Sequence, residues 1–461
     1  MTGSEDRFFS RKGRLARIAL AVSTVFCLAG GAAAAPEQAA KGVQAFSFAL
    51  ANGMQVLVLP DHRAPVVTQM LWFKVGGVDD PQGISGLAHF FEHMMFRGTK
   101  KVPGDLFSQT IAKNGGEDNA FTTEDYTAFF ERIAKDRLPL AMQLEADRLA
   151  NLDLSDAAVA TERDVVLEER RMRIDNDPQA LFGEQLRAAL HLSHPYGRPV
   201  VGWAAEIRHI DRAAAADFYR HHYAPNNAVL IVAGDVTPDE VRTLAQRYYG
   251  PVAARPLTPR AENATVPRLA ETRLTVARPD AKVPMLERIY RVQSYATARP
   301  GGAEALETLA QYLGGDQTAL LYRVLVEQKK LASDVGAYYD GWRRDAAEFI
   351  LYAVPRPGVT LETLEKAMDE VLKGAAAANP NSADLARAKT QLVASAIYRR
   401  DSQTEMAQAY GQALMVGLTV FDVNAWPDRI RKVPAAAVRA AAAGLDRRDA
   451  VTGYLVPGSG K

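Results

Sequence analysis

Two histidines and a glutamate stand within five positions of an otherwise apolar run, GLAHFFEHMMF at residues 86–96. His89, Glu92 and His93 have the spacing i, i+3 and i+4, so in a helix they share one face. Two imidazoles one turn apart can bind the same metal ion, and H-x-x-E-H is the inverse of the zinc-binding pattern H-E-x-x-H. The alternative is a pair of core histidines beside a solvated glutamate.

A third protein ligand is expected, because catalytic zinc commonly has three and leaves the fourth position to water. The stretch ATERDVVLEERRMRIDNDP at 160–178 predicts a helix in which Glu162 and Glu169 lie seven residues, or two turns, apart on one face. Glu168 is rotated by about 100° towards the arginine-rich side, where we expect it to be solvated or ion-paired. From spacing alone, either Glu162 or Glu169 could be the third ligand.

All eight histidines lie at or before His222, so histidine chemistry belongs to the first half of the chain. Six of them lack comparable spacing and we assign them no role: His62, His191, His194, His209, His221 and His222.

The composition predicts a globular protein with two domains. The chain has 461 residues, 48% hydrophobic and 24% charged, which is too long for one ordinary core. Its 55 Lys and Arg residues balance 54 Asp and Glu residues. A nucleic-acid-binding protein would need a dense basic face, so this class of partner is not expected.

Residues 1–35 are predicted to be a cleaved secretory signal peptide. Basic residues between Arg11 and Arg17 precede a twelve-residue apolar run, Ile18 to Ala29, and small residues then lead to Ala35. That run is shorter than the roughly 20 residues of a membrane span, although a retained anchor is the alternative. Removing the segment would change the formal charge from +1 to −2, since it holds five basic and two acidic residues. We therefore expect a periplasmic protein without a stable membrane anchor.

The remaining chain shows signs of two related halves. It opens with a strand pair, FSFALANGMQVLVLP, turned at Asn52-Gly53. Residues 251–273 lack apolar periodicity and predict a linker between an N-terminal domain, 36–250, and a C-terminal domain, 274–461. Segments 212–235 and 434–457 both run from an alanine-rich helix into an apolar strand at an offset of 222, which indicates a duplication. Coincidence of two common helix–strand units is the alternative.

The combination of HFFEH at 89–93 with ERDVVLEE at 162–169 resembles the pitrilysin or insulinase-type (M16) metallopeptidases, and in length the processing-peptidase-like branch. The resemblance continues through GGEDNAFTTEDYT at 115–127, SHPYGRPVVG at 193–202 and VAGDV at 232–236. It implies an α+β fold of two similar domains, each a largely antiparallel sheet with helices packed on it. The metal site would belong to the N-terminal domain, and the homologous C-terminal domain would lack one.

The resemblance also implies roles for the polar residues. His89, His93 and Glu169 would bind one zinc ion per chain, and Glu162 would support the site. The ion would act as a Lewis acid on the scissile carbonyl and lower the pKa of its water. Glu92 would accept the proton of that water and pass it to the leaving amine. The expected activity is that of a zinc endopeptidase acting on unfolded peptides or small polypeptides.

The segment NAFTT at 119–123 resembles the family's edge strand beside the zinc. Asn119, Ala120, Phe121 and Thr122 would then pair with the substrate backbone, reading extended conformation rather than sequence. An ordinary edge strand is the alternative.

A second chain is expected as a partner. Family members usually carry an arginine and, seven residues later, a tyrosine that bind the substrate carbonyl region, but here these positions are Val326 and Ser333. Arg323 with Tyr338 or Tyr339 lacks the spacing. We therefore predict a heterodimer with a homologous chain that supplies the pair. The alternative function is a structural or assembly subunit of the same family with little activity of its own.

Overall fold

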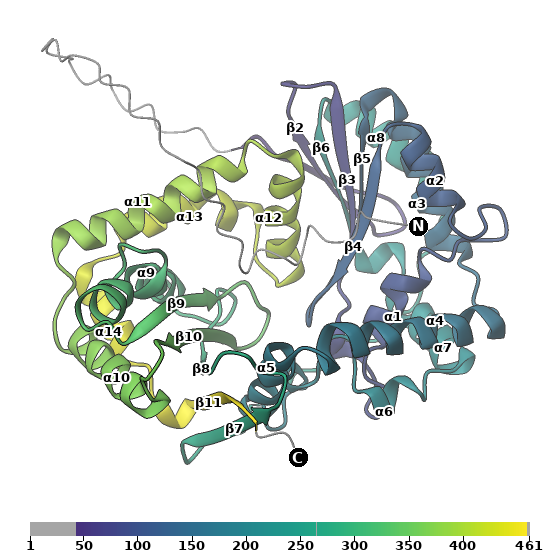
Figure 1. Ribbon diagram of the computed structural model, residues 1–461. Coiled ribbons are helices and arrows are strands. Elements are labelled where there is room, and N and C mark those ends of the chain that lie inside the picture. Colours follow the sequence, from purple (N-terminus) through teal and green to yellow (C-terminus); the bar gives the residue numbers. More distant parts are fainter. Residues whose placement is uncertain (1–42, 264, 459–461) are drawn as a thin grey trace, which may run out of the picture. The chain divides into compact units, whose positions relative to one another are not determined.

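The computed structural model describes residues 43–263 and 265–458, which form two sheets with helices packed on them (Figure 1). This arrangement confirms the predicted α+β fold with two domains. The predicted signal peptide lies outside the described residues. Among the residues described, no helix has the length and apolar character needed to cross a membrane.

The first sheet has six strands in the order β1-β2-β6-β3-β5-β4. Its strands are β1 Phe46–Ala49, β2 Gln55–Pro60, β3 Val66–Phe73, β4 Glu117–Thr122, β5 Thr127–Ala134 and β6 Ala228–Gly234. β1 and β2 form the hairpin predicted from Asn52-Gly53, where Gly53 has a φ of 88° that favours glycine. Neighbouring strands are antiparallel except β2 and β6, and β4 lies at the sheet edge.

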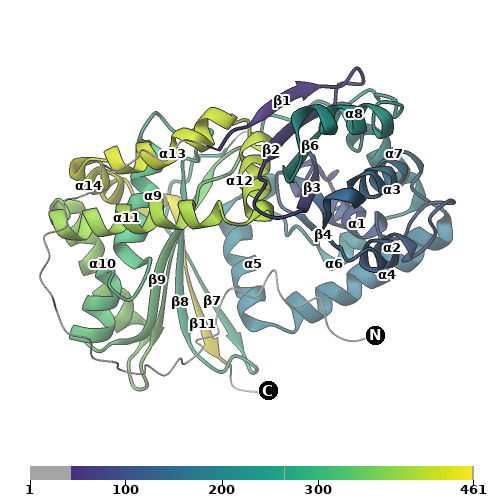
Figure 2. The ribbon, with the colours of Figure 1, turned by 90° about the horizontal axis from the view of Figure 1, so that it is seen from above.

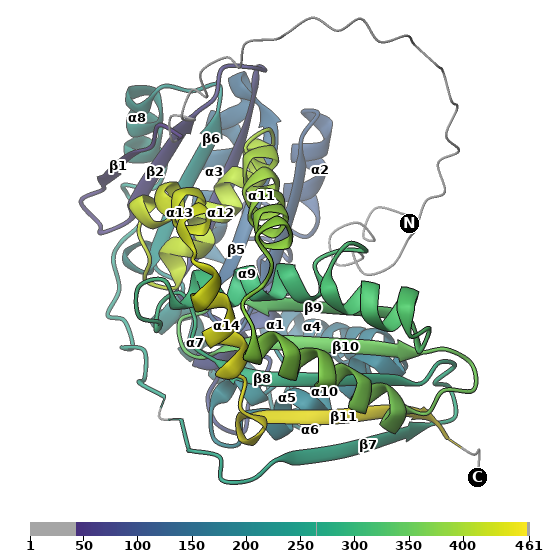
Figure 3. The same ribbon diagram turned by 90° about the vertical axis from the view of Figure 1, so that its left-hand side faces the viewer.

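The second sheet repeats this plan. Its five strands are β7 Thr272–Arg278, β8 Met285–Val292, β9 Ala332–Asp340, β10 Ala347–Pro355 and β11 Ala450–Pro457. Their order, β7-β11-β8-β10-β9, matches β2-β6-β3-β5-β4, and again the first pair is parallel (Figure 3). β6 and β11 are the two strands at the offset of 222. The shared strand order supports the duplication inferred from the sequence.

Helices connect and cover the strands. The first half contains α1 Leu87–Met94, α2 Leu106–Lys113, α3 Leu138–Asn151, α4 Asp156–Arg170, α5 Pro178–Leu190, α6 Ala204–Ile207, α7 Arg212–His222 and α8 Pro238–Tyr248. The second half contains α9 Gly302–Gly314, α10 Leu361–Ala377, α11 Ser382–Arg399, α12 Gln403–Met415, α13 Val420–Lys432 and α14 Ala435–Ala443. The helix expected over 160–178 is interrupted: α4 leads into a π-helical turn, Arg171–Asp175, and α5 then begins at Pro178 under an Asp177 N-cap.

Each half contributes one helix to the core of the other (Figure 2). From the first half, α5 buries Phe182 and Leu186 against Ile289 of the second sheet. From the second half, α12 buries Tyr410 against Trp72 of the first sheet. The two domains therefore share apolar cores.

The segment between the sheets has little regular structure but is held by two arginines. Arg260 donates to the Asp79 carboxylate at 3.0 Å, and Arg268 donates to the carbonyl oxygen of Leu190 at 2.9 Å. β7 begins at Thr272, so the irregular segment runs from the end of α8 to that strand.

Candidate metal centre

Helix α1 positions the histidines, and its first turn is fixed by a buried carboxylate. Asp80 accepts hydrogen bonds from the backbone N–H groups of Gly86 at 2.7 Å and Ala88 at 2.8 Å, which caps the helix N-terminus. Gly86 has a φ of 89°, and a Cβ there would lie 2.4 Å from the carbonyl oxygen of Val201. The opposite face of α1 packs into the first core through Phe90 and other apolar residues.

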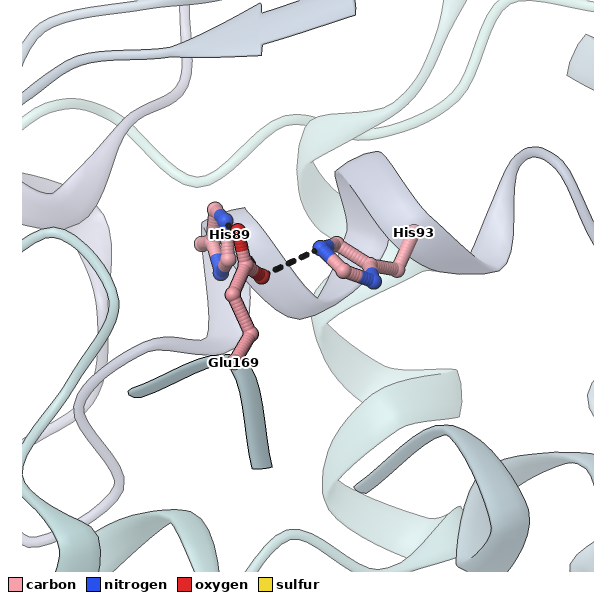
Figure 4. A group of neighbouring side chains, drawn as sticks. All are labelled: His89, His93 and Glu169. Atoms are coloured by element: carbon pink, nitrogen blue, oxygen red, sulfur yellow. Dashed lines mark ion pairs between the residues drawn. The ribbon is translucent and has the colours of Figure 1, made fainter. Parts of the chain in front are cut away.

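Figure 4 shows His89 and His93 of α1 together with Glu169 of α4. Each offers one ligand atom, and these atoms lie within 4.8 Å of one another. The Glu169 Oε2 atom is 2.9 Å from His93 Nε2 and 3.6 Å from His89 Nε2. Helices α1 and α4 thus bring together three residues that are up to 80 positions apart in the sequence.

Glu162 lies behind His93 rather than among the three converging atoms. Its Oε1 accepts from His93 Nδ1 at 2.9 Å, and its Oε2 accepts from Arg97 Nε. A carboxylate on the far nitrogen fixes the tautomer and ring orientation of a ligating histidine. The geometry therefore favours Glu169 over Glu162 as the third ligand, the choice that spacing alone left open.

Glu92 is on the same helix face, one turn from His89, and its carboxylate is held by a hydrogen bond from Thr122. The Thr122 hydroxyl donates to Glu92 Oε2 at 2.5 Å. Burial raises the pKa of Glu92 above its usual value, partly offset by this hydrogen bond. A raised pKa brings a carboxylate closer to the value suited to proton transfer near neutral pH.

The surroundings lower the pKa of His89 and raise the pKa of His93. Burial and the neighbouring His93 lower the pKa of His89 to about 4. Burial also disfavours a charged His93, but its pairs with Glu162 and Glu169 outweigh this effect and raise its pKa to about 9. Burial disfavours a charged Glu169, yet His93, His89 and Arg173 lower its pKa to about 2. Glu169 is therefore ionised and ready to act as a ligand.

The residues present suit a zinc ion. Two imidazole nitrogens and one carboxylate oxygen are ligand types that zinc takes in catalytic sites. Glu169 Oε2 is buried and makes no hydrogen bond within the described part of the chain, despite lying close to both rings. A buried carboxylate oxygen facing two imidazoles without a hydrogen bond is the arrangement expected where a cation binds.

The four residues expected to pair with substrate lie on β4, the edge strand beside the site. Asn119 is exposed, Ala120 and Thr122 are buried, and Phe121 packs edge-on against Trp72 with ring centroids 5.4 Å apart. The strand therefore presents its free backbone edge while its side chains alternate between faces. The Thr122 side chain connects this edge to Glu92.

The second half has neither of the expected carbonyl-binding side chains. Val326 is buried in the core, and the Ser333 hydroxyl donates to the Val354 carbonyl oxygen at 3.3 Å. Arg323 is paired with Asp384 at 2.7 Å, so a shifted arginine is engaged elsewhere.

Tyr338 and Tyr339 are likewise engaged. The Tyr339 hydroxyl donates to the Gln293 carbonyl oxygen at 2.6 Å, and Tyr338 packs against the core that α5 shares with the second sheet.

Other histidines lie against carboxylates away from this site. His191 lies 3.1 Å from Glu348, His194 lies 3.1 Å from Asp345, and His62 lies 2.6 Å from Asp235.

Arg97 and Arg173 contact the site and were not predicted from the sequence. Thr122 was expected to pair with substrate, but its contact with Glu92 was not predicted. Arg97 and Arg173 each follow a site residue by four positions, a helical spacing that could have indicated them.

Comparisons with known proteins identify the family of this chain. Residues 55–203 match the family described as insulinase (peptidase family M16), and residues 209–392 match the peptidase M16 inactive domain. The zinc protease PqqE of Helicobacter pylori is 27% identical over 376 residues, covering 80% of this chain and 83% of that protein. An uncharacterized zinc protease of Mycobacterium leprae is 31% identical over 375 residues, covering 79% and 80%.

The fold matches as well. The crystal structure of a protease from Helicobacter pylori superposes with a TM-score of 0.85 at 24% identity, covering 90% of this chain and 100% of that one. The chain belongs to the insulinase family, peptidase family M16, which confirms the resemblance seen in its sequence.

Proposed function

We propose that this protein is a zinc-dependent endopeptidase that hydrolyses unfolded peptides or small polypeptides. The observation that supports this most directly is the convergence of His89, His93 and Glu169 next to Glu92, a carboxylate that is not one of the three. One zinc ion held by these three residues would polarise the scissile carbonyl and make water a stronger acid.

The other side chains have roles that follow from their contacts. Glu92 accepts a proton from the attacking water and passes it to the leaving amine. Glu162 holds the His93 ring through Nδ1. Asn119, Ala120, Phe121 and Thr122 on β4 offer a strand edge to which an extended peptide adds by backbone hydrogen bonds, which suits broad sequence specificity.

The proposed mechanism is tested by Glu92→Gln. An amide cannot accept the proton, so peptidase activity should fall by about 10²–10⁴-fold while the zinc content stays at that of the wild type. Zinc is measured by metal analysis of the purified protein, and activity with a quenched-peptide library with and without chelator. Substantial chelator-sensitive turnover by the variant would remove Glu92 from the mechanism.

A matched pair of variants tests the third ligand. Glu169→Gln removes a charged oxygen ligand and should lose both zinc and activity. Glu168→Gln changes the adjacent residue, whose carboxylate pairs with Arg171 on the exposed side of the helix at 2.6 Å, and should retain both. The reverse result would move the ligand to Glu168.

We also propose that the active form is a heterodimer in which this chain bears the metal. Support comes from Val326 and Ser333, which cannot supply the arginine and tyrosine expected by resemblance, and from the other engagements of Arg323 and Tyr339. Losing an oxyanion-type donor costs about 10²–10³ in turnover. The isolated chain should bind zinc but cleave peptides poorly, and a homologous chain carrying the pair should restore activity. Full activity of the isolated chain would contradict the heterodimer.

An assembly subunit with little activity of its own is the second candidate, and it is favoured by the same missing pair. It predicts no stoichiometric zinc.

For the cellular location we propose the periplasm, reached through removal of residues 1–35, since these carry the basic and apolar features of a signal peptide. N-terminal sequencing of the exported protein checks this, and an intact Met1 on a cytoplasmic product would contradict it.

A further inference from the structure

Arg173 is a charged residue at the metal centre for which neither the sequence nor the proposed mechanism gives a role. It lies in the π-helical turn Arg171–Asp175, four residues after Glu169. Its Nη1 atom is 3.0 Å from Glu169 Oε1, and about half of its side chain, 56%, is exposed. π-Helical turns within longer helices are frequent at functional sites.

The two oxygens of Glu169 have different neighbours. Oε2 faces the Nε2 atoms of His93 and His89, at 2.9 and 3.6 Å, whereas Oε1 faces Arg173. A carboxylate is free to rotate about its terminal bond, so an unheld Glu169 would exchange its oxygens and vary their direction. The guanidinium removes that freedom by binding the outer oxygen.

The neighbouring arginines show that this contact is specific to Arg173. Arg170 is buried and pairs with Glu184 at 2.8 Å, and Arg171 pairs with Glu168 at 2.6 Å on the exposed side of the helix. Neither is paired with a residue of the metal centre. Glu162 already orients His93 through a hydrogen bond to Nδ1. If Arg173 orients Glu169, two of the three candidate ligands have a supporting side chain.

We infer that Arg173 is a positioning residue that fixes the Glu169 carboxylate for metal binding, with Oε2 directed at the ion and Oε1 turned away from it. This inference rests on the proposed function. An opposing effect is repulsion between the guanidinium and the bound cation, which is weakened by the solvent around the exposed side chain. Supporting contacts of this type typically change metal affinity by about 10–100-fold, so the orienting effect is expected to prevail.

The test measures the apparent zinc dissociation constant by competition with a chelator at fixed pH. Arg173→Ala should weaken zinc binding by about 10–100-fold relative to the wild type. Arg173→Lys keeps the charge without the guanidinium fork, and Arg173→Gln keeps a hydrogen-bond donor without the charge, so both should recover part of the loss. Arg171→Ala removes the same charge two positions away and should bind zinc like the wild type.

Additional measurements separate positioning from folding and from catalysis. The melting temperature of the metal-free proteins should be similar for Arg173→Ala and Arg171→Ala, because each loses an arginine side chain that is more than half exposed. At saturating zinc, Arg173→Ala should regain most of its kcat, since its defect is in metal retention. If Arg173→Ala unfolds, Arg173→Gln carries the comparison instead.

The outcomes that overturn the inference are distinct. Equal or tighter zinc binding by Arg173→Ala overturns it, the tighter result meaning that repulsion prevails. If Arg171→Ala weakens zinc binding as much as Arg173→Ala does, the inference is overturned as well, because any positive charge on this part of the helix would then have the same effect. A wild-type protein that binds no zinc overturns the proposed function and this inference together.

Discussion

At the level of single residues, the geometry of the site depends on the side chains that contact the candidate ligands on the side facing away from the other ligand atoms. Glu162 is almost fully buried, with 2% of its side chain exposed, and it holds His93 through Nδ1. Burial raises its pKa, but His93 and Arg97 outweigh this effect and lower the pKa below its usual value, so it is ionised. Its effect on a bound zinc ion would therefore be indirect, through the His93 ring that it contacts.

We expect Glu162→Gln to weaken zinc binding by about 10–100-fold, because a neutral amide holds the imidazolium or imidazole less firmly than a carboxylate does. The apparent zinc dissociation constant measures this effect. Glu168→Gln, on the exposed side of the same helix, is the control. Unchanged zinc binding in Glu162→Gln would mean that the apolar packing of α1 positions His93 without the Glu162 carboxylate.

Thr122 is a second residue whose role at the site is indirect. Thr122→Val keeps the shape and the β-branch but removes the hydroxyl that donates to Glu92. Hydrogen bonds to charged groups contribute about 1.5–3 kcal/mol, so kcat should fall by about 10–100-fold with the zinc content unchanged. Thr122→Ser keeps the donor and should stay close to the wild type. Equal losses in both variants would point to strand packing rather than to Glu92.

Spacing along the sequence predicted which residues share one face of α1, but not how α1 contacts α4 and β4. Fixed spacing along a helix determines which side chains share a face, so His89, Glu92 and His93 could be grouped without a structure. Glu162 and Glu169 share a face too, and spacing could not decide between them, because the choice depends on how α4 crosses α1. The contact between Thr122 and Glu92 joins a strand to a helix, and a local pattern contains no information on such pairs.

At the level of elements, helices α5 and α12 connect the two domains by packing on each other's sheets. Amphipathic periodicity indicates that a helix has a buried face but not which sheet covers it. The Asn52-Gly53 hairpin and the edge position of NAFTT depend on local turn chemistry and resemblance, and both were predicted. The exchange of α5 and α12 depends on long-range packing and was not.

The packing of α5 can be tested with Leu186→Ala. Leu186 is fully buried between its own helix and the second sheet, so truncation should lower the free energy of unfolding by about 2–5 kcal/mol. Gln185→Ala, on the exposed side of α5, should change it by less than about 0.5 kcal/mol. Urea unfolding followed by circular dichroism measures both. A small effect for Leu186→Ala would mean that α5 is only loosely attached.

At the level of the whole molecule, the duplicated plan shows why, among the described residues, only the first half has the candidate metal centre of His89, His93 and Glu169. Gly86 and Gly301 are both left-handed N-caps, of α1 and α9, with φ values of 89° and 86°. Counting from each glycine, the positions of His89, Glu92 and His93 hold Glu304, Glu307 and Thr308.

The second half fills this place with structural contacts. The Glu307 carboxylate accepts from the Trp426 indole N–H at 3.1 Å and from the Tyr295 hydroxyl, and Glu304 pairs with Arg429 at 2.9 Å. Without imidazoles, the repeated position is part of a buried hydrogen-bond network. The sequence placed all histidine chemistry in the first half, because no histidine follows His222, but it did not indicate which contacts occupy the equivalent positions of the second half.

A last prediction concerns the charged contact between the domains. Glu348 on β10 is buried and lies 3.2 Å from Arg187 and 3.1 Å from His191, both on the α5 side, and 3.9 Å from Arg343. Burial alone would raise its pKa, but the surrounding Arg343, Arg187 and His191 lower it well below the usual value of 4.5. Because the folded-state pKa is depressed, this carboxylate stabilises the fold above about pH 4.5, and that contribution is lost as the pH falls further.

Glu348→Gln should therefore destabilise the protein by about 1–3 kcal/mol at pH 7, since Arg187 and His191 lose their carboxylate partner whereas Arg343 keeps Asp340 at 2.7 Å. The difference from the wild type should narrow as the pH is lowered below about 4.5, where the wild-type carboxylate begins to be protonated on unfolding. Urea unfolding of both proteins at pH 7, 5 and 4 measures this difference in the free energy of unfolding. The control is Glu370→Gln, because Glu370 is exposed and paired with Lys329. A difference that stays constant over this range would mean that the charge of Glu348 contributes nothing and that only its shape and hydrogen bonds stabilise the contact between α5 and β10.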